Sequence, residues 1–215
     1  KEIDKALPVV FSKATTSKIE NSHLAFLINQ ALEMPPTLWV YGYWDQNEGL
    51  LGATPEFLFY MDQSGTQSMA LAGTAPLEPK NDRLPLLQDQ KELLEHQLVV
   101  TDIKNRLSVF GNVSVSDTKE LVLPTLKHIQ TMIHIDEKPN PIELVSFMHP
   151  TPALGVSPRN FGYQWMQELP EQKDRHFHGG AFYFDTNEFQ VALVCIRNLM
   201  WKNFVKTDSD KSTEL

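Results

Sequence analysis

Apolar residues along this chain switch between helical spacing and strand-like clustering, which predicts helices and strands in mixed order. Helical spacing predicts four helices, over residues 22–33, 86–109, 142–148 and 160–169. Ser22 is a suitable cap for the first of them. The longest predicted helix has five apolar residues on one side, namely Leu94, Leu98, Val99, Ile103 and Leu107.

The remaining segments have the composition of strands and turns. Between residues 38 and 69, aromatic and β-branched residues surround two turn sequences, which predicts an antiparallel meander. A proline-bearing loop is expected over 75–85. Further strands are predicted at 113–122 and 126–135, and a hairpin over 180–204. Because there is no regular βαβ rhythm, we expect an α+β fold of antiparallel sheets flanked by helices, in one domain covering residues 1–215.

Charge and composition narrow the class of partner. Asp and Glu number 27 against 19 Lys and Arg, and the net charge of −8 disfavours nucleic acid. No apolar run approaches the roughly 20 residues of a membrane span, so no membrane contact is expected. The single cysteine, Cys195, excludes an internal disulfide and suits a reducing compartment, so we expect a cytoplasmic protein.

Four groups of residues are candidates for chemistry. Glu92 and Glu95 share one face of the long predicted helix with Asp102, and converging carboxylates suit Mg²⁺. From spacing alone, a solvated acidic stripe is the favoured alternative. Glu56 precedes an apolar run, where a carboxylic acid tends to stay protonated, although an outward-facing strand residue is the commoner case.

The other two candidates are basic. Arg197 ends the apolar run 191–196, so it needs an anionic partner, which is either a structural carboxylate or a ligand. Lys5 lies between Ile3 and Val9 and is either a buried base or a solvated residue. Since motifs for phosphate loops, zinc ligands and serine nucleophiles are absent from the sequence, the residues alone indicate an α+β domain suited to binding an anion through a metal.

Seven short segments resemble, in order, the motifs of the chorismate-utilising enzymes. This family contains anthranilate, aminodeoxychorismate, isochorismate and salicylate synthases. The segments are Ile3-Asp4-Lys5, Gly52-Ala53-Thr54-Pro55-Glu56, Leu71-Ala72-Gly73-Thr74, Lys91-Glu92-Leu93-Leu94-Glu95-His96, Pro124-Thr125-Leu126-Lys127-His128, His149-Pro150-Thr151-Pro152-Ala153-Leu154, and the closing pair Gly179-Gly180 and Cys195-Ile196-Arg197.

The resemblance implies a role for each matching residue. Lys5 would be the general base that activates water, and Glu56 the general acid that protonates the departing C4 hydroxyl. Glu95 would bind Mg²⁺ with support from Glu92, and Arg197 would bind a chorismate carboxylate. The substrate pocket would also contain Gly73, Thr74, His128, Thr151, Ala153, Leu154 and His178, the last at a position where many members have Tyr.

Individual positions indicate the branch of the family. Aminodeoxychorismate synthases carry a nucleophilic lysine where this chain has Ala72, and branches that use ammonia do not need a base at Lys5. Water is therefore the expected nucleophile, and the resemblance implies a Mg²⁺-dependent isochorismate synthase without an amidotransferase subunit. The product would serve menaquinone synthesis, siderophore synthesis or another pathway. The alternatives are a lyase that makes anthranilate, aminodeoxychorismate or salicylate, and a non-catalytic chorismate-binding domain.

The end of the chain departs from the family pattern. The glycine-rich strand that holds a substrate carboxylate in the family is not visible after Val205. Glu214 would be the first glutamate of a closing metal-binding pair, and its partner would fall beyond Leu215. We therefore expect the domain to be incomplete at its C-terminus.

Overall fold

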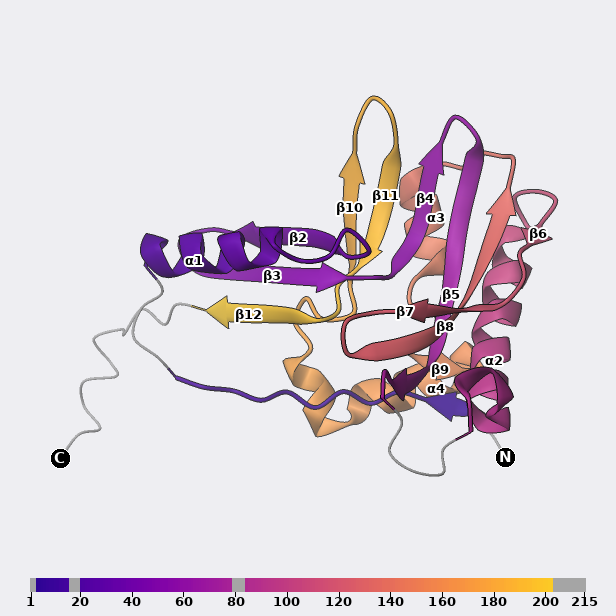
Figure 1. Cartoon of the computed structure of the whole chain (residues 1–215), viewed down its shortest axis with the longest axis horizontal. Coiled ribbons are helices and arrows are strands. Elements are labelled where there is room, and N and C mark those ends of the chain that lie inside the picture. The colour runs from indigo at the N-terminus through magenta and orange to yellow at the C-terminus, as the bar shows by residue number, and fades with distance from the viewer. Residues whose placement is uncertain (1–2, 16–19, 79–83, 203–215) are drawn as a thin grey trace.

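The structure is a computed structural model that describes residues 3–15, 20–78 and 84–202, and it confirms the α+β class. The larger sheet has seven antiparallel strands (Figure 1). Six follow the spatial order β10 (Ala181–Asp185), β11 (Gln190–Val194), β4 (Phe57–Asp62), β5 (Gly65–Pro76), β8 (Leu126–Ile135) and β6 (Ser114–Val115). The seventh, β7 (Lys119–Val122), also pairs with β8.

Two smaller sheets complete the β-structure. One has the order β12 (Asn198–Lys202), β3 (Glu48–Thr54) and β2 (Trp39–Trp44), and its strands run across those of the larger sheet in Figure 1. The other pairs β1 (Lys5–Ala6) with β9 (Val156–Ser157). The predicted meander is present as four consecutive strands. The first two belong to the three-stranded sheet, and the two after Thr54 belong to the larger sheet.

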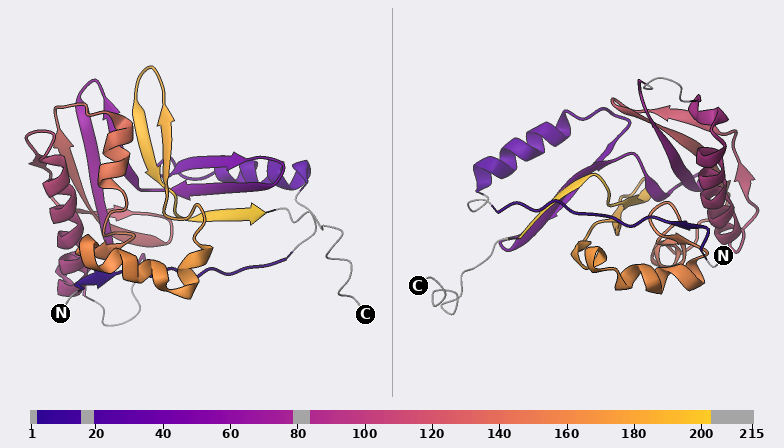
Figure 2. Two further views of the ribbon diagram at one scale, coloured as in Figure 1. Left: turned by 180° about the vertical axis from the view of Figure 1, so that it is seen from behind. Right: turned by 90° about the horizontal axis from the view of Figure 1, so that it is seen from below.

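The four predicted helices are present as α1 (Asn21–Leu32), α2 (Gln90–Leu107), α3 (Pro141–Met148) and α4 (Arg159–Glu168). Short 3-10 turns, η1 (Leu86–Gln88) and η2 (Pro170–Asp174), precede α2 and follow α4. Figure 2 shows α1 beside the three-stranded sheet and away from α2. None of the helices in the described residues is long and apolar enough to cross a membrane.

Several local predictions were wrong. Ser22 does not cap α1, because the helix begins one residue earlier and the Glu20 N–H donates to His23 Nδ1. Leu94 is 64% exposed, since the buried face of α2 is rotated toward Glu92 and His96. The strand predicted over 113–122 is two short strands, and β5 extends to Pro76 into the predicted loop.

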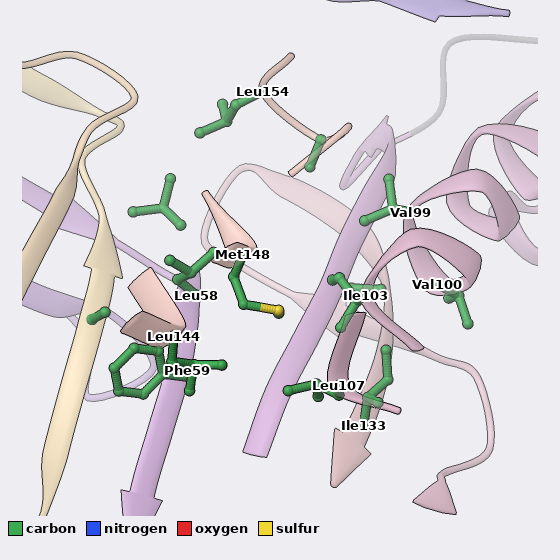
Figure 3. Close-up of a cluster of buried hydrophobic side chains, with 14 of the residues drawn as sticks. Leu58, Phe59, Val99, Val100, Ile103, Leu107, Ile133, Leu144, Met148 and Leu154 are labelled. Carbon is green, nitrogen blue, oxygen red and sulfur yellow. The ribbon is translucent and has the colours of Figure 1, made fainter. Parts of the chain in front are cut away.

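The larger sheet is covered on both faces, so successive residues of its central strands are buried in different clusters. On β5, Ala70 and Ala72 contact the cluster formed with α2 and α3, whereas Met69 and Leu71 face the three-stranded sheet. Figure 3 shows the first cluster, in which Ile103 is fully buried. Its other labelled members are Leu58, Phe59, Val99, Val100, Leu107, Ile133, Leu144, Met148 and Leu154.

The chain crosses between the two larger sheets at two adjacent places. It leaves the three-stranded sheet between Thr54 and Phe57, and it returns between Val194 and Asn198. Backbone hydrogen bonds join the two crossings, from Val194 N to Glu56 O at 3.1 Å and from Ala53 N to Arg197 O at 3.3 Å. Both crossings therefore lie together at the edge of the core.

Candidate active site

A cavity of about 240 Å³ lies where the two crossings meet β5, β8 and α2. Its wall combines apolar side chains with carboxyl, imidazole and guanidinium groups. The lining residues are Leu7, Pro55, Glu56, Leu71, Ala72, Gly73, Thr74, Glu95, His128, Ala153, Leu154, Ile196 and Arg197. Segments far apart in sequence, including α2 with Glu95 and the crossing with Arg197, are thus brought to one place.

The first crossing places the Glu56 carboxyl at the cavity wall with only 4% of the residue exposed. Burial raises the pKa of Glu56 to about 8, although the positive charges of Lys5 and Arg197 oppose the shift. The carboxyl is therefore largely protonated at pH 7, which is the state that a general acid needs. The predicted tendency to stay protonated is supported by this environment.

A β-bulge on β5 shapes the opposite wall. The pairing of β5 with β8 shifts register between Ala72 and Thr74, and Gly73 at the bulge has φ +79°. A Cβ atom on Gly73 would lie 2.8 Å from Ile129 Cδ1 and 3.1 Å from the Glu92 carbonyl oxygen, and other residues are strained at this φ, so the position favours glycine. The bulge turns the Thr74 side chain outward, where it is exposed at the cavity.

Helix α2 holds this bulge through two buried side chains. The Thr74 N–H donates to Glu92 Oε2 at 2.9 Å, and His96 Nδ1 donates to the Ala72 carbonyl at 3.2 Å. Lys91 Nζ lies 3.1 Å from the other Glu92 oxygen. Sequence reasoning missed the structural role of His96, since its partner on β5 lies 24 positions away along the chain.

The two glutamates of α2 consequently differ in position. Glu92 is buried behind the bulge and is not on the cavity wall, whereas Glu95 is on the wall. Glu95 Oε1 forms an ion pair with Lys5 Nζ at 3.1 Å, and Lys5 Nζ also donates to the Pro152 carbonyl at 2.8 Å. Because the Lys5 side chain is only 8% exposed, this is a buried contact of β1 with α2 and not a solvated terminus.

Asp102, the third acidic residue on α2, has a structural role. Its Oδ2 lies 2.5 Å from Arg159 NH2 on α4 and 3.4 Å from Arg106 Nε. It is not part of the cavity wall.

His128 connects two other groups on the wall. Its Nδ1 lies 2.9 Å from Thr74 Oγ1, and its Nε2 lies 2.6 Å from Arg197 NH2. Burial and the neighbouring Arg197 lower the pKa of His128 to about 4, so the imidazole is neutral at pH 7. Within the described residues, no salt bridge joins Arg197 to a carboxylate. Of the two predicted partners, a structural carboxylate is therefore not found there.

Two predicted pocket residues lie away from this wall. His178 lines a neighbouring cavity of about 420 Å³ together with His149 and Arg175, and its Nδ1 lies 3.3 Å from Asn198 Oδ1. Thr151 is buried, and its hydroxyl has no hydrogen-bond partner among the described residues. Glu214 lies outside the described residues, so its role stays a prediction.

Several apolar residues of the cavity wall were not among the predicted site residues. Leu7 follows Lys5 by two residues, and Pro55 and Ile196 adjoin the predicted Glu56 and Arg197. Their closeness in sequence to the predicted residues was the available signal. Their inward direction depends on how the crossings are packed.

Magnesium fits this wall only with help from a ligand. Within the described part of the chain, no group of three or more His, Cys, Asp or Glu side chains could hold a metal ion. Glu95 presents one carboxylate, while the Glu92 oxygens bind Thr74 and Lys91. Mg²⁺ commonly uses one or two protein carboxylates together with substrate oxygens and water, and Glu95 suits such a site.

The chain belongs to the family described as chorismate binding enzyme, whose model matches residues 2–201. It is 30% identical over 180 residues to isochorismate synthase MenF of Bacillus subtilis, which covers 78% of this chain and 38% of that protein. It is 35% identical over 140 residues to isochorismate synthase EntC of Escherichia coli, covering 61% of this chain and 36% of that protein.

A solved structure agrees with the family in fold. MenF, the menaquinone-specific isochorismate synthase of Escherichia coli, superposes with a TM-score of 0.75 at 20% identity, covering 94% of this chain and 48% of that one. The chain therefore spans less than two fifths of these two curated relatives and about half of this solved structure.

Proposed function

We propose that the protein containing this chain is a Mg²⁺-dependent isochorismate synthase, which adds water to C2 of chorismate and removes the C4 hydroxyl. The observation that carries the proposal is the protonated Glu56 carboxyl on a cavity wall that also presents Arg197 and Glu95. This set supplies a proton donor, a cation for a carboxylate and a metal ligand. The relatives named isochorismate synthase support the same reaction.

In this reaction each residue has a separate task. Lys5 takes a proton from the water that attacks C2, and Glu56 gives its proton to the hydroxyl that leaves C4. One water is thereby added and one water is released. Arg197 binds a substrate carboxylate, and the apolar wall excludes bulk water from the ring. Bound Mg²⁺ would neutralise charge on a substrate carboxylate beside Glu95. Since a base must be neutral, the proposal requires the Lys5–Glu95 ion pair to open.

The test is product analysis with the full-length protein, chorismate and Mg²⁺. Isochorismate should form, and Glu56→Gln should lower turnover by about 10²- to 10⁴-fold while chorismate still binds. Glu188→Gln, an exposed carboxyl change on the hairpin, is the matched control and should leave turnover unchanged. Absence of any conversion by the unaltered protein would contradict the proposal.

Added ammonium distinguishes the branches of the family. With water as the nucleophile and no amidotransferase subunit, ammonium should give no aminated product, and Lys5→Ala should remove most turnover. Anthranilate formed with ammonium, or salicylate formed without it, would assign the protein to the lyases. Binding of chorismate without turnover would indicate a non-catalytic domain.

A further inference from the structure

We propose that His128 is a positioning residue, which is held as the neutral Nδ1–H tautomer, directs Arg197 toward a carboxylate of the ligand, and leaves the Thr74 hydroxyl proton free to bond the same ligand. The proposal rests on the proposed function for the identity of that ligand. It adds a defined proton position on His128 and a second donor, Thr74 Oγ1, to the ligand site.

The tautomer follows from the chemistry of arginine. A guanidinium group has five N–H donors and no acceptor, so the contact of 2.6 Å between Arg197 NH2 and His128 Nε2 requires Nε2 to accept. Nε2 therefore has no proton. The neutral ring must carry its proton on Nδ1, and a charged ring would place a second cation against Arg197. The pKa of about 4 for His128 agrees with this assignment.

The same proton sets the direction of the next hydrogen bond. His128 Nδ1–H points at Thr74 Oγ1, 2.9 Å away, so the threonine oxygen accepts. The Thr74 hydroxyl proton is then available for another acceptor, and no other described residue bonds to this oxygen. The bulge at Gly73, held by Glu92 and His96, fixes the Thr74 backbone in this place.

Arg197 needs such a partner because of its position in the chain. It lies in the crossing between β11 and β12 with φ +55°, and its residue surface is exposed at the cavity. A long side chain in that setting loses conformational entropy when it binds a ligand. His128 reduces this loss, since it holds one guanidinium nitrogen before the ligand arrives.

The result is a row of three groups, in which the neutral His128 ring accepts from Arg197 and donates to Thr74. All three line the cavity. Because the guanidinium and the hydroxyl lie on opposite sides of the imidazole, they suit two different polar groups of one ligand, with the carboxylate at Arg197. His128 itself has both ring nitrogens engaged, so it is not the acid or base of the reaction.

The first test needs neither a variant nor a ligand. The ¹⁵N shifts of the His128 ring in the full-length protein should show the Nδ1–H tautomer, and the ring should stay neutral down to about pH 5. An Nε2–H tautomer, or a charged ring at pH 7, would overturn the proposal. This measurement stands even if chorismate is not the substrate.

The second test compares two replacements that each keep one half of the imidazole. In His128→Gln the amide oxygen reaches the Nε2 position and preserves the acceptor for Arg197, whereas His128→Asn preserves only the donor near Nδ1. Measured by calorimetry with Mg²⁺, chorismate affinity should fall by about 10- to 100-fold in His128→Asn and only a few-fold in His128→Gln. Equal losses would contradict a role through Arg197.

A control variant and a double-mutant cycle with Arg197 complete this experiment. His134→Gln changes the same residue type on the same strand, where Nε2 contacts Asp136 outside the cavity, and should leave affinity unchanged. In an Arg197→Lys background, His128→Asn should cause little further loss, because its partner is already altered. Fully additive losses would show that His128 contacts the ligand independently. If the unaltered protein fails to bind chorismate, the proposed function fails while the tautomer result remains decisive for His128.

Discussion

Glu56 is a buried acid whose charge is controlled by its surroundings and not by a hydrogen-bond partner. Among the described residues none forms a hydrogen bond with its carboxyl, while Lys5 and Arg197 are near enough to oppose the effect of burial. The unfolded chain releases this proton near the ordinary pKa of 4.5, and the folded chain retains it up to about pH 8. The fold is therefore stabilised below pH 4.5 and loses that contribution as the pH rises to about 8.

Glu56→Gln should remove this loss of stability. A displacement of the pKa from 4.5 to about 8 corresponds to roughly 5 kcal/mol, so the variant should gain up to that amount on the unaltered protein between these two pH values. Urea unfolding at a series of pH values measures it, with the exposed Glu188→Gln as control. Stability curves of Glu56→Gln and the unaltered protein that stay parallel would mean that Glu56 is ionised at neutral pH.

Glu92 and Glu95 lie three positions apart on α2. Glu92 accepts from the Thr74 N–H and Glu95 pairs with Lys5, so variants can test their roles separately. Glu95→Gln should abolish the Mg²⁺ dependence of chorismate binding, because Glu95 is the α2 carboxylate on the cavity wall. Glu92→Gln should keep that dependence, since a glutamine oxygen can still accept the Thr74 N–H. Calorimetry with and without Mg²⁺ gives the comparison. Loss of metal dependence in Glu92→Gln would restore the predicted supporting role.

At the scale of elements, the bulge on β5 joins the strand to α2 and presents Thr74. A comparison of two glycines separates the cost of the positive φ at the bulge from the cost of a close side-chain contact there. Gly73 and Gly179 both have φ near +78°, at +79° and +77°, but a Cβ on Gly179 would meet nothing closer than 3.5 Å. Gly73 therefore combines an unfavourable φ for other residues with a close contact to Ile129.

Gly73→Ala should destabilise the fold by roughly 2–4 kcal/mol, and Gly179→Ala by about 1 kcal/mol. The difference arises because the added methyl group at position 73 must displace Ile129 Cδ1, which lies 2.8 Å away. Denaturant unfolding measures both values. Equal destabilisation of the two variants would mean that β5 and β8 relax around the new side chain.

The sequence was sufficient for most elements and for the identity of most wall residues, but not for their partners. Apolar spacing located α2 and β8, because the pattern that identifies each element lies within the element itself. It could not show that the strands after Thr54 belong to another sheet, because β3 and β4 are both rich in buried residues and follow each other directly. Likewise, spacing placed Glu92 and Glu95 on one face, whereas the bulge that binds Glu92 lies 18 residues earlier.

For the molecule as a whole, the smallest sheet lies beside the site, since Leu7 directly follows β1 and lines the cavity. Lys5 lies on β1, which has two residues and pairs only with β9 among the described residues. Neighbouring backbone bonds run from Asp4 N to Ser157 O and from Leu7 N to Gly155 O, at 2.8 and 3.0 Å. So short a pairing opens more readily than the central strands.

Hydrogen exchange should reveal this difference and its response to ligand. The amides of Asp4 and Leu7 should exchange much faster than those of buried Ile129 on β8, and chorismate with Mg²⁺ should slow them selectively. The reason is that a ligand in contact with Leu7 and Glu95 stabilises β1 in place. Slow exchange of β1 without ligand would show that this side of the cavity is already fixed.

The two chain crossings give the molecule a mechanical property. Glu56 and Arg197 lie at the joint between the two larger sheets, and the bonds from Val194 N to Glu56 O and from Ala53 N to Arg197 O tie that joint together. When two rigid plates tilt about a joint, the far edges travel and the pivot stays almost still. A tilt of one sheet against the other about this joint would therefore change the separation of Glu56 and Arg197 less than that of residues at the far edges of the sheets.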